Sequence, residues 1–139
     1  MAVYPVYNNI FKIGSSASDL NTIADMETFE VSFDNNIEEW TPMDQEGWKR
    51  RLATGKSLSI TLSGKRNVGD DGNDYVAGLG FKSGTDLNSH FEWTMPDGTK
   101  IAFACVVNVT NINGGDSTNV GALEFEVMCD GKPTVTAGT

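Results

Sequence analysis

Residues 57–64 read Ser-Leu-Ser-Ile-Thr-Leu-Ser-Gly. Leu58, Ile60 and Leu62 occupy every second position, and small hydroxyl residues stand between them. This period of two is typical of a β-strand with one face in the core and the other in water. Because the wet face carries Ser and Thr and no long charged side chain, it can lie against another surface or line a smooth, water-filled space.

Four further segments carry β-strand patterns: residues 26–33, 91–95, 101–110 and 122–128. The first and the last alternate between apolar and polar side chains, as a strand with one buried face does. The tight turn Pro-Asp-Gly-Thr at residues 96–99 predicts that the second and third segments form a β-hairpin. Both faces of residues 101–107 are apolar, which predicts a central strand that is covered on both sides.

Weaker patterns describe the start of the chain and its single expected helix. Residues 1–25 are polar, so we interpret them as an arm or an irregular lead-in, with a weak helical option at residues 18–24. Asn73 or Asp71 is suited to cap a helix of about two turns. The apolar side chains that would then face the sheet are Tyr75, Val76, Leu79 and Phe81.

The segment of residues 34–56 lacks a continuous strand pattern and is expected to be a long loop, with at most short strand ends. It begins with the turn signal Asp-Asn-Asn, and Pro42 would interrupt a β-ladder. A connection of this length is uncommon in a small domain unless it has a function or is disordered, and Trp40 and Trp48 argue against disorder. Two interpretations stay open. In the first, the tryptophans fold back onto the core. In the second, the segment protrudes and docks on another subunit, because Trp and Arg are enriched at binding hot spots.

Composition limits the class of protein. A chain of 139 residues is the size of one domain, and no apolar run reaches the ~18 residues that suggest a membrane span. The net charge of −9 argues against affinity for a phosphate backbone, because such binding depends on Lys and Arg. The N-terminus shows no signal-peptide pattern, so we expect folding in a cytoplasm, with Cys105 and Cys129 as reduced thiols.

No catalytic, cofactor-binding or metal site is predicted. The acidic cluster of residues 70–74 suggests a calcium loop, but Tyr75 occupies the sixth position, where an EF-hand needs Gly. His90 is the only histidine, so a site with two imidazoles cannot form. Neither a nucleophile elbow nor a phosphate-binding Gly-rich loop occurs, and we therefore expect a protein that is not an enzyme.

Several motifs together resemble one known family. They include Glu-Glu-Trp-Thr-Pro-Met-Asp at residues 38–44, Gly-Trp-Lys-Arg-Arg-Leu at residues 47–52, Ser-Gly-Lys-Arg-Asn-Val-Gly-Asp at residues 63–70 and Gly-Asn-Asp-Tyr-Val-Ala-Gly at residues 72–78. The segments at residues 29–34, 96–100 and 121–127 continue the match. Over about residues 26–133 the sequence is similar to the major tail tube proteins of long-tailed phages and prophages of Gram-positive hosts.

The resemblance implies a mainly β protein, an antiparallel β-sandwich with one short flanking α-helix and a long protruding loop. It divides the chain into an arm (residues 1–25), the sandwich domain (residues 26–133) and a tail (residues 134–139). Six copies would form a ring, and stacked rings would form a virion tail tube that conducts genomic DNA without binding it specifically. The implied partners are further copies, the tape measure, the tail terminator and the distal tail protein, with assembly in the host cytoplasm and neither a cofactor nor a membrane involved.

Two sets of residues follow from this implied architecture. The expected lining of the channel is acidic or polar: Glu30, Ser59, Thr61, Glu124 and Glu126. The expected contacts between rings lie in the long loop: Glu38, Glu39, Trp40, Met43, Trp48, Arg50 and Arg51. The alternative for the glutamates is an ordinary solvated sheet surface.

A different class of function also fits the composition. A monomeric sandwich of the carbohydrate-binding or adhesin type could use Trp40, Trp48 and Trp93 as a stacking platform. Such domains are usually exported, and the absence of a signal-peptide pattern makes this alternative weaker. Electron microscopy of the concentrated protein distinguishes the two hypotheses.

Overall fold

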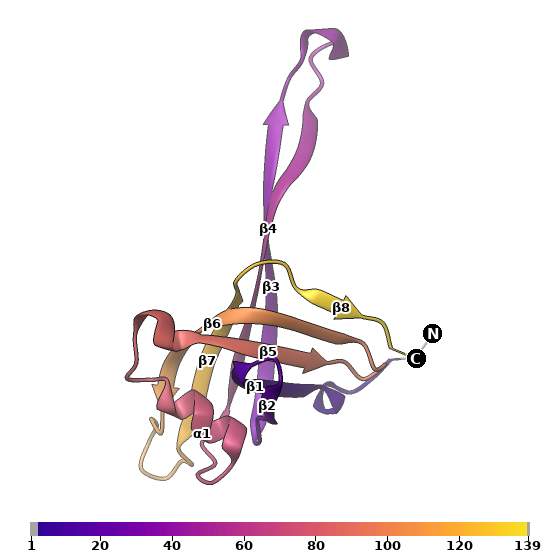
Figure 1. Cartoon of the computed structure of the whole chain (residues 1–139). Helices are drawn as coiled ribbons and strands as arrows, with labels where there is room; N and C mark the ends of the chain where they lie inside the picture. Colours follow the sequence, from indigo (N-terminus) through magenta and orange to yellow (C-terminus); the bar gives the residue numbers. More distant parts are fainter. Residues whose placement is uncertain (1–2, 139) are drawn as a thin grey trace.

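One antiparallel sheet forms most of the protein, whose computed structural model describes residues 3–138 (Figure 1). Its strands are β1 (Ile10–Ser16), β2 (Asp19–Thr22), β3 (Met26–Trp40), β4 (Arg50–Lys65), β5 (Asn88–Thr94), β6 (Lys100–Ile112), β7 (Ala122–Cys129) and β8 (Thr134–Thr136). They follow the order β2-β1-β5-β6-β7-β4-β3, and β8 pairs with the start of β6. The helix α1 (Asp71–Gly78) and the short 3-10 helices η1 (Val6–Asn8), η2 (Met43–Gln45) and η3 (Gly84–Leu87) complete the elements.

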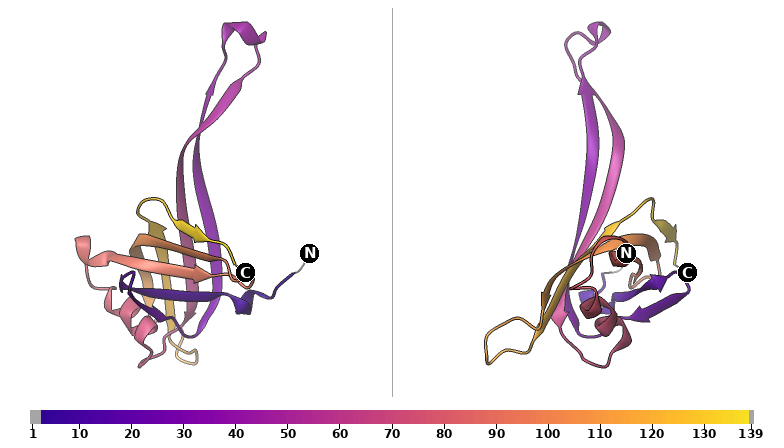
Figure 2. Two further views of the ribbon diagram at one scale, coloured as in Figure 1. Left: turned by 45° about the vertical axis from the view of Figure 1, so that its right-hand side comes forward. Right: turned by 60° about the vertical axis from the view of Figure 1, so that its left-hand side comes forward.

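The sheet curves so strongly that its two ends face each other as the layers of a sandwich (Figure 2). Phe11 of β1 meets Phe29 of β3 edge to face, with ring centroids 4.8 Å apart. Trp93 of β5 also contacts Phe29, at 5.6 Å. Such pairs add to the free energy gained by burying the rings. The expected mainly β, antiparallel fold with a single α-helix is confirmed.

The alternating patterns correspond to core-facing and solvent-facing side chains. Leu58, Ile60 and Leu62 are buried, and β4 lies between β3 and β7 in antiparallel register. The predicted hairpin is present as β5 and β6, and the predicted last strand is β7. Each fully buried side chain of this size contributes roughly 1.5 to 3 kcal/mol relative to an exposed one. The core is therefore built from the alternation that the sequence shows.

The expected irregular lead-in is wrong for residues 10–22, which form β1 and β2. Phe11 and Ile13 of β1 are buried, and β1 pairs with both β2 and β5. Gly14 is needed in β1 because a Cβ atom there would overlap the carbonyl group of Asp19. The weak helical option at residues 18–24 is likewise wrong. The polar composition concealed a short strand pair that forms one end of the sheet.

The expected helix is present, with some differences in detail. The side chain of Asp70 caps it by accepting the N–H of Asn73, so the cap is neither Asn73 nor Asp71. Val76 and Leu79 enter the core, whereas Phe81 lies beyond the helix and is 97% exposed. Figure 1 places α1 at the end of the body opposite the long hairpin. In the described part of the chain, no helix is long and apolar enough to cross a membrane.

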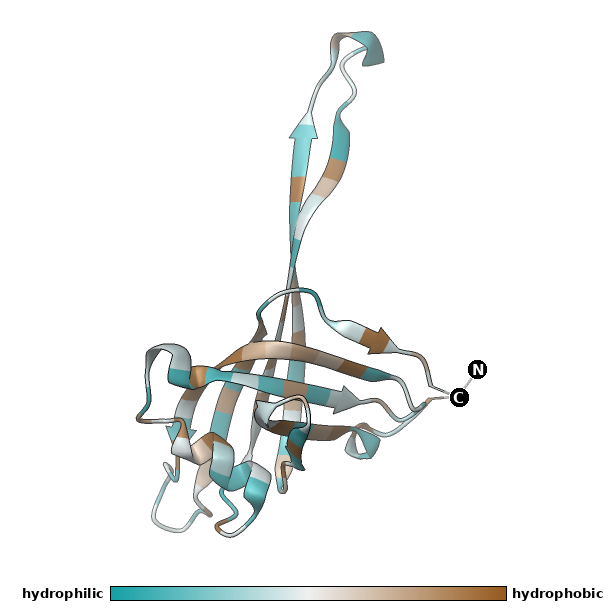
Figure 3. Cartoon of the chain, viewed as in Figure 1, coloured by the Kyte–Doolittle hydropathy of each residue, from teal (hydrophilic) through white to brown (hydrophobic). Residues whose placement is uncertain are grey.

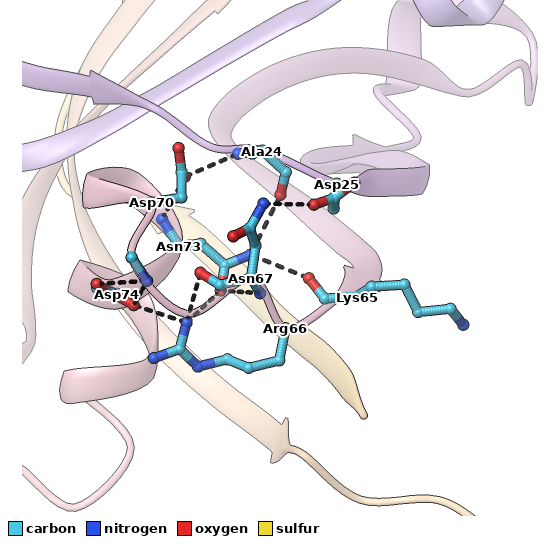
Figure 4. Close-up of polar contacts among 9 residues, drawn as sticks. Ala24, Asp25, Lys65, Arg66, Asn67, Asp70, Asn73 and Asp74 are labelled. Atoms are coloured by element: carbon cyan, nitrogen blue, oxygen red, sulfur yellow. Dashed lines mark hydrogen bonds and ion pairs between the residues drawn. The ribbon is translucent and has the colours of Figure 1, made fainter. Parts of the chain in front are cut away.

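A buried amide joins three segments at this end of the body (Figure 4). The Nδ2 atom of Asn73 donates to the carbonyls of Ala24 and Lys65, at 3.1 and 3.0 Å. Its Oδ1 atom accepts from Arg66 Nη1 and from the N–H of Asn67, at 2.7 and 3.0 Å. All four hydrogen-bonding positions of the amide are thus used. The side chain ties α1 to the corner before β3 and to the end of β4.

The carboxylates of the acidic cluster take part in the same network. Asp70 Oδ2 also accepts the N–H of Ala24, at 3.0 Å. Asp74 forms an ion pair with Arg66, at 2.8 Å, and accepts the N–H of Gly69. The hydrogen bond from Arg66, followed by that from Gly69, holds the pKa of Asp74 below its ordinary value of 3.8. The cluster serves to position the helix.

We predict that Asn73→Ala destabilises the protein by roughly 2 to 4 kcal/mol, because four partly buried polar groups lose their partner. Urea unfolding followed by circular dichroism measures the loss. The matched control is Asn119→Ala, since Asn119 is exposed, and it should change the free energy of unfolding by less than about 0.5 kcal/mol. Equal midpoints for both variants would contradict the role of the amide.

We also predict a specific pH dependence for the ion pair of Asp74. A pKa that is lower in the folded state means that the ionised group stabilises the fold above pH 3.8, and that this contribution disappears as the pH falls through the folded value. The melting temperature of Asp74→Asn should therefore fall less than that of the unmodified protein between neutral pH and about pH 3. Calorimetry checks this, with Asp116→Asn as an exposed control.

Candidate assembly surfaces

The segment that was expected to be a loop is a projecting β-hairpin. β3 and β4 pair from Met26 opposite Gly64 up to Trp40 opposite Arg50. β7 accompanies β4 only from Ser59 onward. Residues 34–56 therefore extend beyond the body as a two-stranded ribbon with a short turn, which we call the hairpin arm (Figures 1 and 2). The expectation of a loop with at most short strand ends is wrong, although the expected protrusion is present.

Apolar residues occur along the hairpin arm (Figure 3), and several of their side chains are exposed. At its far end Trp48 is 74% exposed and Met43 is fully exposed. Ile37, Trp40 and Leu52 are also exposed along the ribbon. The interpretation in which the tryptophans fold back onto the core is therefore wrong. A group of exposed apolar residues on a protruding element is typical of a surface that binds another protein.

Only local contacts hold the far half of the hairpin arm together. Arg51 Nε pairs with Glu39 Oε2 at 2.6 Å, and the hydrogen bond from Arg51 lowers the pKa of Glu39. The guanidinium of Arg50 lies 5.8 Å from the centroid of the Trp40 ring. Exposed ion pairs and cation–π contacts contribute little, about 1 kcal/mol or less each. A two-stranded ribbon is only marginally stable by itself, so the arm would gain most from contact with a partner.

The seven residues expected at ring contacts all lie on this half of the hairpin arm. Glu38, Glu39 and Trp40 end β3, and Arg50 and Arg51 begin β4. Met43 is in η2 and Trp48 follows it, with the N–H of Trp48 donating to the carbonyl of Gln45 at 2.9 Å. Gly47, with a φ of 88°, takes the left-handed conformation that the turn needs. Sequence reasoning thus located a compact set, but it did not predict the β-pairing that presents the set.

The five residues expected to line a channel share the solvent-facing side of β3, β4 and β7, which we call the polar sheet face. Register places Glu30 opposite Thr61, and Thr61 opposite Glu126, so these three side chains form one row across the strands. Ser59 lies two residues along β4, on the same face. The opposite side of the three strands carries core residues such as Ile60. The face is polar and is not covered by any element of the described chain.

Glu124 is the most firmly held carboxylate of the polar sheet face. Its Oε1 atom accepts from Ser63 Oγ at 3.2 Å, and its Oε2 atom accepts from Asn111 Nδ2 at 3.0 Å. Ser63 is its direct neighbour on β4. Neutral hydroxyl and amide donors orient the carboxylate without cancelling its charge. Sequence reasoning named Glu124 but missed Asn111, because the bulge in β6 that brings it into place is not visible in a local pattern.

Both ends of the sheet have unpaired edges. The outer edge of β3, which is 15 residues long, pairs with no other strand within residues 3–138, and β2 is the edge at the other end. Free N–H and C=O groups on such an edge can pair with a strand of another chain. A soluble monomer normally protects a long edge. The β3 edge is therefore a third surface that is suited to association.

The alternative of a tryptophan platform for carbohydrates is wrong. Trp93 is buried in the core, where its Nε1 atom donates to Asn9 Oδ1 at 2.8 Å. Trp40 and Trp48 lie on the hairpin arm, outside the body. The three rings do not form a common surface. Within residues 3–138, no group of three or more His, Cys, Asp or Glu side chains is placed to hold a metal ion.

No protein-family model and no curated protein matches the sequence. Solved structures do match. A chain from the tail of an empty gene transfer agent (GTA) particle, determined with C6 symmetry, has a TM-score of 0.77 at 20% identity, with 97% of this chain and 100% of that chain covered. A chain from the sheath-tube complex of PVC, an extracellular contractile injection system, has a TM-score of 0.62 at 16% identity, covering 97% and 92%.

A third match is a chain from the tube-terminating cap of the anti-feeding prophage, with a TM-score of 0.62, 14% identity, and coverage of 99% and 95%. These matches run over nearly the whole of each chain, so they include the body and the hairpin arm together. At such identities the likeness is one of fold. The chain has the β-rich fold that occurs in phage-like tails and contractile injection particles.

Proposed function

We propose that the protein is a structural virion protein whose copies assemble into stacked rings and thereby form the tube of a phage-like tail. The observation that carries the proposal is the hairpin arm, a ribbon that exposes Trp40, Met43 and Trp48 away from a well-packed body. Burial of these side chains against a neighbouring copy would stabilise an assembly, at roughly 25 cal/mol per Å² of apolar surface. The fold shared with tail and injection particles supports the proposal.

Ring formation is the first step of the proposed assembly. The long free edge of β3 is suited to continue the sheet into the next subunit. Repeated heterologous contacts of this kind close into a ring when the rotation between subunits is suitable. We propose six subunits in each ring, since the matching GTA tail has C6 symmetry. The hairpin arm would then reach the adjacent ring, with its seven far residues at the contact.

The polar sheet face would line the channel of the tube. Glu30, Glu124 and Glu126 would repel the phosphate groups of DNA, and the small Ser59 and Thr61 side chains would offer no obstacle to its passage. DNA would therefore slide through without specific binding. As part of a tail, the protein would also meet the tape measure, the terminator and the distal tail protein. Its place would be the virion, after assembly in the cytoplasm of a bacterial host, and a Gram-positive host remains a prediction.

We predict that Trp40→Ala and Trp48→Ala remain folded but no longer form tubes, because each removes an exposed anchor of the hairpin arm. Negative-stain microscopy and sedimentation of the concentrated protein measure assembly, and circular dichroism measures folding. The matched control is Val68→Ala, which truncates an exposed apolar residue outside the arm. Tubes of normal length and stability in both Trp variants would show that the arm does not stack the rings.

We predict that the double variant Glu124→Lys and Glu126→Lys still forms tubes but delivers the genome poorly. The introduced lysines would attract DNA in the channel, where the glutamates repelled it. Infectivity of the parent particle, together with the count of intact tails in micrographs, separates delivery from assembly. Asp86→Lys is the control for an added positive charge at an exposed site outside the polar sheet face. Normal infectivity of the double variant would argue against a channel role for this face.

A further inference from the structure

Two cysteines lie directly opposite each other on neighbouring strands. Cys105 of β6 and Cys129 of β7 are register partners, and both are free thiols. Paired residues of antiparallel strands point to the same side of the sheet. The buried neighbours Val107 and Val127 occupy the same side, so both thiols belong to the core-facing layer.

The backbone around this pair already has the separation that a disulfide requires. The N–H of Asp130 donates to the carbonyl of Ala104 at 2.7 Å. This hydrogen bond lies just outside the pair, which makes Cys105 and Cys129 a non-hydrogen-bonded pair of the ladder. The Cα atoms of such a pair are about 4.5 Å apart, whereas disulfides span roughly 4.4 to 6.8 Å. Bond formation therefore needs no change of register.

The two thiols differ in their access to solvent. Cys105 is only 1% exposed, and burial, followed by the nearby Cys129, raises the pKa of its thiol to about 12. Cys129 is partly exposed and lines a cavity of about 580 Å³ at the base of the hairpin arm. A volume of this size is within the range of small-molecule sites, which is about 300 to 1,000 Å³. A reagent in the cavity would thus meet Cys129 first.

The cavity also has a distinct charge. Its charged lining residues are Lys56 and Lys132, and its other lining residues are uncharged. Phe33, Ile101 and Val135 supply apolar walls. On a protein whose net charge is −9, this combination favours a small anionic molecule over a cationic one.

We propose that Cys129 and Cys105 form a modification site that reacts with a small anionic disulfide in the cavity and closes into a cross-strand disulfide. The thiolate of Cys129 attacks one sulfur of the reagent, forms a mixed disulfide and releases the first thiolate. Cys105 then attacks the Sγ atom of Cys129 and gives its proton to the second thiolate of the reagent, which leaves as a thiol. The protein loses two electrons and two protons, and the reagent becomes two thiols.

Closure of the bond would change a contact at the root of the hairpin arm. The Sγ atom of Cys129 now accepts the N–H of Leu58 of β4 at 3.2 Å. The side chain of Cys129 must rotate about its Cα–Cβ bond, which breaks this weak hydrogen bond, before its Sγ atom can bond to Cys105. Cys129 is the last residue of β7, and the turn at Gly131, with a φ of 104°, follows it. The reaction would exchange a β4–β7 contact for a covalent β6–β7 link.

The test uses the full-length, folded protein and oxidised glutathione as the anionic disulfide. After the reaction, free thiols are alkylated and the intact mass is measured without a reductant. Apart from any mass added by alkylation, the protein should be about 2 Da lighter than before the reaction and should carry no stable adduct. A peptide map should contain one cross-linked pair that joins Cys105 to Cys129 within a single chain. The variant Cys105→Ser should instead keep a glutathione adduct on Cys129, and Cys129→Ser should remain unmodified while folded.

The role of the cavity is tested by comparison with cystamine, a cationic disulfide. The double variant Lys56→Gln and Lys132→Gln should react about three-fold more slowly with oxidised glutathione at low salt, and no more slowly with cystamine. Three results would contradict the proposed disulfide within one chain. They are a persistent adduct on Cys129 in the protein without substitutions, a disulfide between two chains, and a reaction that occurs only in urea. Equal reaction rates with oxidised glutathione and cystamine would show that the cavity does not select an anionic ligand.

Discussion

The ladder between β3 and β4 is the interaction on which the rest of the structure depends. Within the body, every second residue pair of this ladder faces the core, as Phe29 with Leu62 and Val31 with Ile60 do. Beyond the body the same backbone pairing continues without a core, up to Trp40 opposite Arg50. Backbone hydrogen bonds and a few exposed side-chain contacts therefore support the hairpin arm, whereas hydrophobic burial supports the body. The arm is consequently an element whose packing would be completed outside the chain.

The corner between β2 and β3 connects the two ends of the sheet. Asn73 fastens this corner to α1 and to the end of β4 through four hydrogen bonds. Asp25, at the corner itself, has a φ of 62° and accepts a hydrogen bond from Asn67 at 2.6 Å. A buried polar group is tolerated when all its partners are present, and it then specifies one arrangement. The motif that first looked like a metal loop thus acts as a structural joint.

The surfaces suited to association follow from this arrangement. The free edge of β3, the hairpin arm and the polar sheet face all belong to the β3–β4 pair or to its neighbour β7. The layer of β1 and β5 completes the core from the other side. One half of the sandwich therefore carries the surfaces suited to association, and packing against the other half stabilises it as a folded unit.

Much of the body could be predicted from the sequence, because a strand with one buried face alternates at a period of two whatever its partners are. β5, β7 and the part of β4 within the body were identifiable in this way. β6 was identifiable from its continuous apolar run, and the single helix from its cap candidates and apolar side chains. The two tryptophans of the hairpin arm were also recognised as unusual. These features depend on neighbours a few residues away.

Apart from the β5–β6 hairpin, which its turn predicted, only the tertiary structure decided which strands pair, because the other pairings join residues that are distant in the chain and the local pattern carries no record of them. β1 and β2 escaped notice since their core contribution rests on Phe11 and Ile13 alone among polar residues. The β-pairing within the hairpin arm escaped notice since a ribbon without a buried face has no reason to alternate. The row from Glu30 through Thr61 to Glu126 and the opposition of Cys105 and Cys129 are consequences of register, which the packing of the core sets.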